Sequence, residues 1–183
     1  MRKLALALAA TGLFALGSLS APAVASVETH EAKAEAATAA AIARADMYDA
    51  FGDVTLKPGR YLWRDVPTSA GPERVVVSLN DQLAWLYRGD TLVAVTTISS
   101  GTDSHPTPTG IFNIHTKKTM HRSRKYENAP MPFAQFIDQY GIALHAGHLP
   151  GHPASHGCIR LPAQFAAKLF KVTDLGTTVM IGA

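Results

Sequence analysis

Most of the chemically reactive side chains of this 183-residue chain fall between residues 145 and 162. The segment reads HAGHLPGHPASHGCIRLP and holds four of the eight histidines and the only cysteine, Cys158. A free cysteine has a pKa of about 8–9, which a neighbouring imidazole or a cluster of backbone N–H groups can lower into the range of a working nucleophile. Gly157 lets the backbone turn sharply before the thiol. The segment therefore predicts a cysteine nucleophile at Cys158, with His145 as its general acid and base.

A metal site and a purely structural role are the alternatives for the same residues. His148, His152 and His156 are spaced by four, but the intervening prolines and glycines exclude the helix that would align them. A loop can still bring such donors and Cys158 to a zinc ion. Taken singly, His148 and His152 fit loop residues that face water, and His145 fits a histidine buried in the core. A lone cysteine also fits a small buried side chain or a disulfide to another chain.

The first 25 residues have the pattern of an export signal. Arg2 and Lys3 precede an apolar run over residues 4–19, and Ala23-Val24-Ala25 supplies the small-x-small pattern before a cleavage site. An uncleaved membrane anchor is the alternative, but the run is short for a span. We therefore expect a signal peptide over residues 1–25, no membrane span in the mature chain, and a location in the periplasm or cell wall.

The charge of the chain argues against a nucleic-acid partner. Seventeen Lys and Arg against 14 Asp and Glu give a formal net charge of +3. Removal of Arg2 and Lys3 leaves 15 basic against 14 acidic residues, a net charge of +1 that is scattered along the chain. So weak a field does not indicate a polyanion as the main partner.

The remaining chain divides into three parts. Residues 26–55 are rich in alanine, which favours helix, and have few large apolar side chains before Met47, which predicts a spacer. The alternative is a helix packed on the catalytic domain. Residues 56–73 predict a lead-in turn and a short strand. Residues 74–183 hold the apolar runs of the catalytic domain.

This last part predicts a mostly β fold. Three runs joined by tight turns, over residues 74–79, 82–87 and 91–99, predict an antiparallel meander. Further strands are expected over 111–114, 142–145 and 177–181, and one helix over 162–172. Residues 116–132 predict a long polar connection, of the length typical of functional lids or of disordered segments.

Several motifs of this chain resemble one known family. The residues Ser155-His156-Gly157-Cys158-Ile159-Arg160-Leu161 resemble the signature of the L,D-transpeptidase (YkuD-type) catalytic domain, with its [ST]HGC core. Four further segments resemble, in order, its opening strand pair, its TPTGxF segment, its lid-side motif and the strand of its catalytic histidine. They are Val77-Ser78-Leu79 with Gln82, residues 106–112, Met131-Pro132, and residues 144–147. The resemblance covers about Arg74 to Ile181.

The resemblance implies a β-sandwich-like catalytic domain, with one helix in its C-terminal half after the catalytic cysteine. Cys158 would attack the bond before the terminal D-alanine of a peptidoglycan tetrapeptide stem and form an acyl-enzyme, with His145 moving the protons. The acyl group would pass to an amine, giving a 3→3 cross-link between stems or an attached protein. Alternatives are a carboxypeptidase or amidase that uses water, and a non-catalytic metal-binding wall protein. The resemblance implies no cofactor and no metal.

The resemblance also suggests residues that support the site. The group expected to form the oxyanion hole or to hold the cysteine loop is Ser155, His156 and Gly157. The group expected to contact substrate is Arg160, Ala146 and Met131. Arg160 stands where many relatives carry asparagine, and its forked guanidinium suits a carboxylate. Because Ala146 stands where some members have serine, the imidazole would have to be oriented by a backbone carbonyl, that of Ala146 being the candidate.

Overall fold

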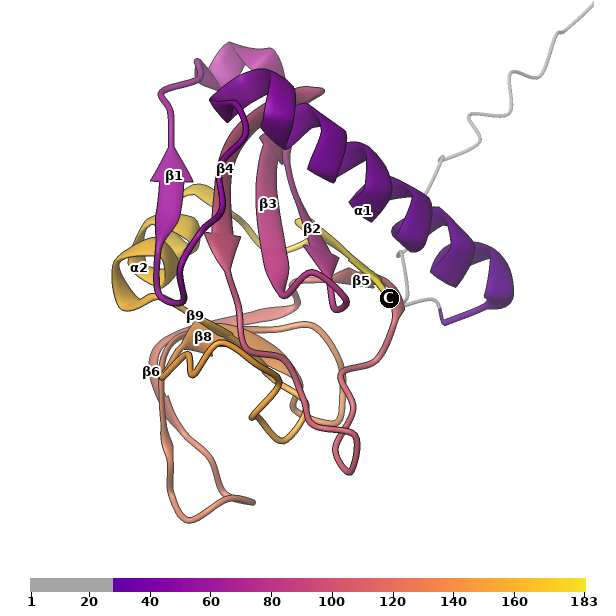
Figure 1. Ribbon diagram of the computed structural model, residues 1–183. Coiled ribbons are helices and arrows are strands. Elements are labelled where there is room, and N and C mark those ends of the chain that lie inside the picture. The colour runs from indigo at the N-terminus through magenta and orange to yellow at the C-terminus, as the bar shows by residue number, and fades with distance from the viewer. Residues whose placement is uncertain (1–27) are drawn as a thin grey trace, which may run out of the picture.

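The structure, a computed structural model, describes residues 28–183 and places them in two β-sheets, two α-helices and one 3₁₀ turn (Figure 1). Sheet A has the strand order β1-β4-β3-β2-β10-β5, and sheet B the order β6-β7-β8-β9. The sheet A strands are β1 Tyr61–Trp63, β2 Glu73–Ser78, β3 Leu83–Arg88, β4 Thr91–Thr97, β5 Gly110–Asn113 and β10 Thr178–Gly182. The sheet B strands are β6 Thr116–Arg122, β7 Pro130–Phe136, β8 Ala143–Ala146 and β9 Ile159–Leu161. The helical elements are α1 His30–Phe51, η1 Thr68–Ala70 and α2 Ala163–Val172.

The mostly β fold with one late helix is confirmed. The expected signal peptide at residues 1–25 lies outside the described residues. Within residues 28–183, neither α-helix combines the length and the apolar character that a membrane crossing requires.

Sheet A is buried on both faces, which explains its continuous apolar runs. Val75 and Val77 of β2 contact the core between the two sheets, while Val76 contacts the opposite layer beneath α1. On β3, Leu86 faces the core between the sheets and Trp85 faces α1. The pairs β2–β3 and β3–β4 are antiparallel, so the predicted meander is present.

The alanine-rich segment forms α1, which lies across the strands of sheet A (Figure 1). One stripe of the helix is buried: Ala32, Ala36, Ala40, Ala43 and Met47. These small side chains let the helix approach β10 closely, since a Cβ added at Gly182 would lie 2.7 Å from the Cα of Ala37. The structure therefore differs from the predicted spacer and has the alternative, a packed helix. Close backbone approach replaces the large apolar side chains that usually mark a docked helix.

Sheet B begins with a hairpin where the sequence predicts a polar connection. Strands β6 and β7 pair antiparallel, with His121 opposite Met131, and only residues 123–129 form the turn. The side chains of β6 are exposed or half-buried along its whole length, so the strand carries no apolar alternation that could reveal it. The expected loop over residues 116–132 is therefore a hairpin with a short turn.

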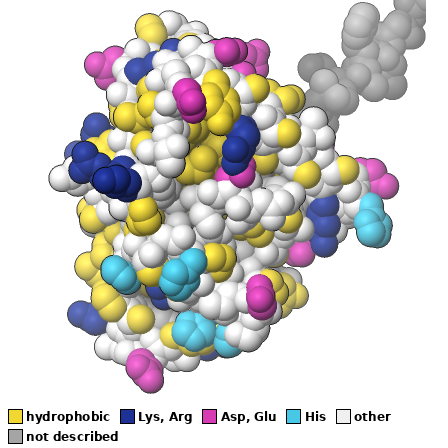
Figure 2. All heavy atoms as spheres, viewed as in Figure 1, with side chains coloured by type: hydrophobic (Ala, Val, Ile, Leu, Met, Phe, Trp, Pro, Cys, Tyr) yellow, Lys and Arg dark blue, Asp and Glu magenta, His cyan; other side chains and the backbone are white. Residues whose placement is uncertain are grey.

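The core between the sheets is closed by α2. Phe165 and Leu169 of this helix pack into it, as do Leu144 of β8 and Ile159 of β9. Strand β10 then returns to sheet A parallel to β2. Most histidine side chains visible in Figure 2 gather on the lower half of the face shown, on the side of the molecule that sheet B forms.

Candidate active site

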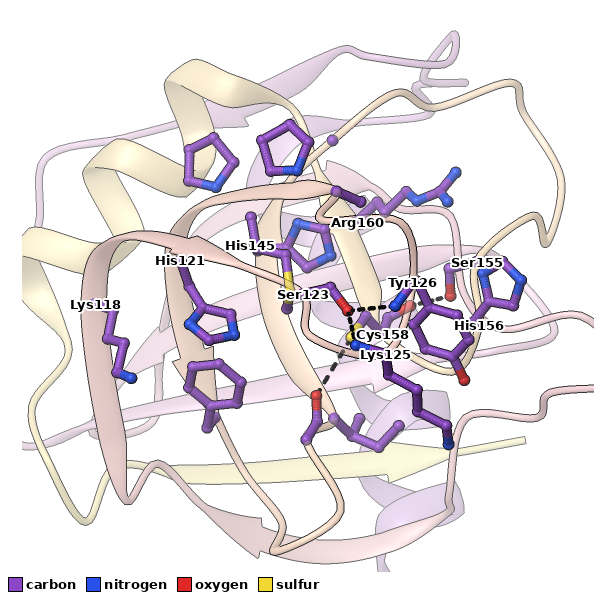
Figure 3. A pocket seen from close by; sticks show the side chains of 18 of the residues that line it. Lys118, His121, Ser123, Lys125, Tyr126, His145, Ser155, His156, Cys158 and Arg160 are labelled. Carbon is purple, nitrogen blue, oxygen red and sulfur yellow. Dashed lines mark hydrogen bonds between the residues drawn. The ribbon is translucent and has the colours of Figure 1, made fainter.

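Two paired strands, β8 and β9, bring His145 and Cys158 to the lining of one pocket. The two strands are parallel, with Leu144 paired to Ile159 and His145 to Arg160. Because Leu144 and Ile159 point into the core and side chains alternate along a strand, His145, Cys158 and Arg160 face the other way. Figure 3 shows the three side chains directed into the same pocket, a cavity of about 1090 Å³.

The imidazole of His145 is held in one tautomer. Its Nδ1 lies 2.8 Å from the carbonyl oxygen of Ala146, and because a carbonyl only accepts, Nδ1 carries the proton and Nε2 the lone pair. The side chain is 7% exposed, and this burial lowers the pKa of His145 below its ordinary 6.5, with the Ala146 bond opposing the shift. The imidazole is therefore a neutral base at neutral pH. The sequence predicts the Ala146 carbonyl as the orienting group, and the structure contains this contact.

The thiol of Cys158 is protonated at rest. Burial raises its pKa above the ordinary 9.0, while a hydrogen bond from the backbone of Ala143 acts in the opposite direction. The Sγ lies 3.6 Å from the carbonyl oxygen of Gly141, to which the thiol donates. The resting pair is thus a neutral thiol beside a neutral imidazole.

The loop before Cys158 is fixed by hydroxyl groups. Ser155 donates its hydroxyl to the carbonyl of Cys158 and accepts the N–H of Gly157 at 3.1 Å. Thr107 donates to the carbonyl of Gly157 at 2.8 Å, and Gly157 has a φ of 106°, which favours glycine. Because the Gly157 N–H is engaged by Ser155, it is not free for an oxyanion.

The side chain of His156 points away from the thiol. It stacks on Tyr126 with ring centroids 4.2 Å apart and an interplanar angle of 22°, and it meets His105 edge to face at 4.7 Å. Tyr126 lies in the turn between β6 and β7, so this stack holds that turn against the cysteine loop (Figure 3). Neither Tyr126 nor His105 was predicted to belong to the site. Only the position of Tyr126 in the expected lid pointed to it.

The predicted substrate contacts also line the cavity. The stem of Arg160 packs on Gly147, where an added Cβ would lie 2.9 Å from the Arg160 Cγ. Met131 is buried beside Ala143 and forms part of the cavity wall. His121 lines the same cavity without having been predicted, and burial together with two nearby cations lowers its pKa.

The residues of the zinc alternative are not brought together. His148 and His152 are exposed, as the sequence predicts for loop residues. Within the described part of the chain, no group of three or more His, Cys, Asp or Glu side chains is arranged to hold a metal ion.

Comparison with known proteins identifies the family to which this fold belongs. The family model of the L,D-transpeptidase catalytic domain (YkuD) matches residues 72–181, more than half of the chain. The chain belongs to this family. A comparison with curated proteins found no significant match.

Solved L,D-transpeptidases share the fold. One from Stackebrandtia nassauensis is 23% identical with a TM-score of 0.57, the match covering 74% of this chain and 64% of that one. One from Xylanimonas cellulosilytica is 26% identical with a TM-score of 0.56, covering 65% and 64%. L,D-transpeptidase 3 from Mycobacterium tuberculosis, solved with a faropenem-derived adduct, is 19% identical with a TM-score of 0.56, covering 61% and 60%. The chain thus spans less than two thirds of each of these structures.

Proposed function

We propose that the protein is an exported cysteine L,D-transpeptidase that acts on the tetrapeptide stems of peptidoglycan. The observation that carries the proposal is the pairing of β8 with β9, which brings a tautomer-fixed His145 and Cys158 to the lining of one cavity. Membership of the L,D-transpeptidase family supports peptidoglycan as the substrate. The neutral states of both groups suit general-base activation of a thiol during the reaction, without a preformed ion pair.

The first half-reaction forms the acyl-enzyme. The Cys158 thiol turns from the Gly141 carbonyl toward His145, and Nε2 takes its proton as the sulfur attacks the carbonyl carbon before D-alanine. The resulting oxyanion accepts a hydrogen bond from the Cys158 N–H. When the intermediate collapses, the C–N bond breaks, His145 returns the proton to the leaving amine, and D-alanine departs. Acyl group and enzyme are then joined as a thioester.

The second half-reaction transfers the acyl group. An acceptor amine, on a second stem or on a protein, gives a proton to His145 and attacks the thioester carbon, so a C–N bond forms and the C–S bond breaks. The sulfur then recovers the proton from His145. Arg160, directed into the cavity, suits a carboxylate of the stem. Water in place of the amine would yield a shortened stem.

The proposal is tested first by covalent labelling. Because a structurally similar enzyme carries a faropenem-derived adduct, faropenem is the probe. Intact mass spectrometry should show one adduct on the protein and none on Cys158→Ala. An unlabelled wild-type protein that binds zinc stoichiometrically would instead support the metal-binding alternative.

The acceptor is tested with digested cell walls. Incubation with the protein followed by chromatography of the products should show 3→3 linked dimers and free D-alanine. Shortened stems without dimers would assign the protein to the carboxypeptidases. The Cys158→Ala protein is the control. If the wild-type protein forms neither dimers nor shortened stems, the proposed activity is refuted.

A further inference from the structure

Gln82 has no part in the chemistry proposed above, yet its side chain is fully engaged. It lies in the turn between β2 and β3 with a φ of 52°, a conformation uncommon for residues other than glycine. Its Nε2 donates to the Leu79 carbonyl at 2.8 Å and to the Ser100 hydroxyl at 2.7 Å, and its Oε1 accepts the Ser100 N–H at 3.1 Å. These partners fix the orientation of the amide, because only Oε1 can face an N–H and only Nε2 a carbonyl. Gln82 therefore clamps Ser100 through two hydrogen bonds.

The residues around Ser100 carry the cysteine loop on their other side. The Ser100 carbonyl accepts the N–H groups of both Ala154 and Ser155 at 3.0 Å. Its neighbour Ser99 exchanges two backbone hydrogen bonds with Arg160, at 3.1 and 3.0 Å. The segment from Ser99 to Ser100 thus holds the chain on both sides of the nucleophile. Ser100 is 2% exposed, so these bonds are shielded from water.

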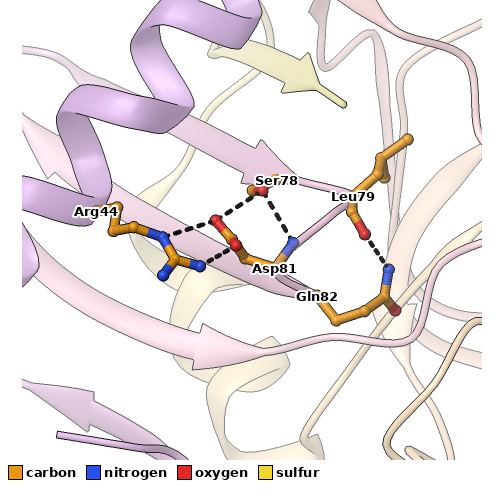
Figure 4. Close-up of polar contacts among 5 residues, drawn as sticks. All are labelled: Arg44, Ser78, Leu79, Asp81 and Gln82. Atoms are coloured by element: carbon orange, nitrogen blue, oxygen red, sulfur yellow. Dashed lines mark hydrogen bonds and ion pairs between the residues drawn. The ribbon is translucent and has the colours of Figure 1, made fainter.

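The same turn is tied outward to α1 by a second, separate set of contacts (Figure 4). The Asp81 carboxylate pairs with Arg44 of α1 and accepts the hydroxyl of Ser78 at 3.0 Å. Arg44 is half exposed, and its guanidinium bonds to Asp81 rather than to the Gln82 amide, whose partners are Leu79 and Ser100. It therefore offers a matched control, since its removal disturbs the turn on the side away from the cavity.

We propose that Gln82 is a positioning residue for the nucleophile, acting through Ser100 on the loop of residues 154–157. By fixing Ser100, it sets where the Cys158 sulfur and the Cys158 N–H stand relative to the acyl carbon. The inference rests on the proposed function, because it assigns Cys158 the attack. It predicts that Gln82 matters for acyl transfer more than for the intrinsic reactivity of the thiol.

Gln82→Asn is the variant of choice. Asparagine tolerates the left-handed conformation, but its amide is one methylene short of Ser100. Two rate constants for Cys158 should be compared: acylation by faropenem, which needs the oxyanion donor in place, and alkylation by iodoacetamide, which does not. In Gln82→Asn we expect acylation to fall by about tenfold or more, since small displacements of reacting groups have effects of this size, with alkylation within about twofold of wild type. Arg44→Ala should leave both constants unchanged.

The inference would be overturned if the ratio of the acylation to the alkylation rate constant were the same in wild type and in Gln82→Asn. It would also be overturned if Arg44→Ala lowered this ratio as much as Gln82→Asn does. If Gln82→Asn does not fold, Ser100→Ala removes one of the two clamping bonds. A smaller fall of the ratio is expected there, and an unchanged ratio counts against the proposal.

Amide hydrogen exchange separates this inference from the proposed function. The N–H groups of Ala154 and Ser155 should exchange faster in Gln82→Asn than in wild type or Arg44→Ala, whether or not the protein reacts with faropenem. Unchanged exchange would show that Gln82 does not hold the loop. If the wild-type protein forms no faropenem adduct, the proposed function is refuted. The exchange rates of the Ala154 and Ser155 N–H groups would still show whether Gln82 holds the loop.

Discussion

Replacement of His145 by glutamine tests how the thiol is activated. Glutamine has a similar volume and can donate to the Ala146 carbonyl as Nδ1 does, but it cannot accept a proton near neutral pH. The variant therefore removes the base while keeping the contact that orients the side chain. Without that base, reaction of Cys158 depends on the fraction of thiol that is already ionised.

The size of the effect follows from the pKa of the thiol. With the ordinary pKa of 9.0, about one thiol in a hundred is ionised at pH 7, and burial of Cys158 raises its pKa and makes the fraction smaller. His145→Gln should therefore slow faropenem acylation by about 100-fold or more at pH 7, equal to about 2.7 kcal/mol in the activation free energy. Because the thiolate fraction rises about tenfold per pH unit below the thiol pKa, the deficit should shrink by that factor with each unit. The wild-type rate should stay level to below pH 6.5, because burial lowers the pKa of His145.

The assay is the acylation rate constant measured by mass spectrometry from pH 5.5 to 10. His152→Gln is the matched control, because this histidine is exposed and lies outside the cavity, and its profile should overlay that of wild type. A His145→Gln profile that runs parallel to the wild-type profile at every pH would refute the reasoning, since it would make His145 structural only.

Three further substitutions test packing and substrate contact. Gly182→Ala should lower the free energy of unfolding in urea by about 1–3 kcal/mol, because its Cβ would come 2.7 Å from the Ala37 Cα. Met47→Ala should cost about 2–5 kcal/mol in the same measurement, since the side chain is buried between α1 and sheet A. Gly147→Ala should displace the Arg160 stem and slow acylation by about tenfold, the effect of weakening one hydrogen bond to a charged group, without moving the urea midpoint. An unmoved midpoint in the first two, or an unchanged rate in the third, would contradict these expectations.

Local sequence pattern was sufficient for the strands that lie inside the protein. It also selected His145 and Cys158, which line the same cavity in the structure. β-Branched runs predicted β2 and β4, because a strand buried on both faces must be apolar throughout. The alternation of Leu83, Trp85 and Tyr87 predicted β3. The segments around Cys158 and His145 were recognisable because cysteine and histidine are residue types that act as nucleophiles and general bases. The Ala146 contact followed from the absence of a side chain at that position able to orient the imidazole.

What the sequence did not reveal depends on contacts between distant segments. The α1 helix docks through close approach of its backbone at Ala36 to Gly182. A periodic pattern of large apolar residues, which would have predicted this docking, is absent from the helix. Strand β6 was hidden because its side chains meet solvent. The clamp between Gln82 and Ser100 joins residues 18 positions apart in sequence, and its hydrogen bonds leave no pattern in residue types.

The central place of β10 in sheet A has a consequence for folding. This strand lies between β2 and β5. Residues of β2 near position 75 therefore pair with residues about a hundred positions further along the chain. Such distant parallel pairing makes folding slow, because a large loop must close before the pairing stabilises anything. Until β10 pairs with it, β2 forms an open edge of the β2–β4 meander, and sheet A remains incomplete. A chain that crosses a membrane before it folds would benefit from that delay.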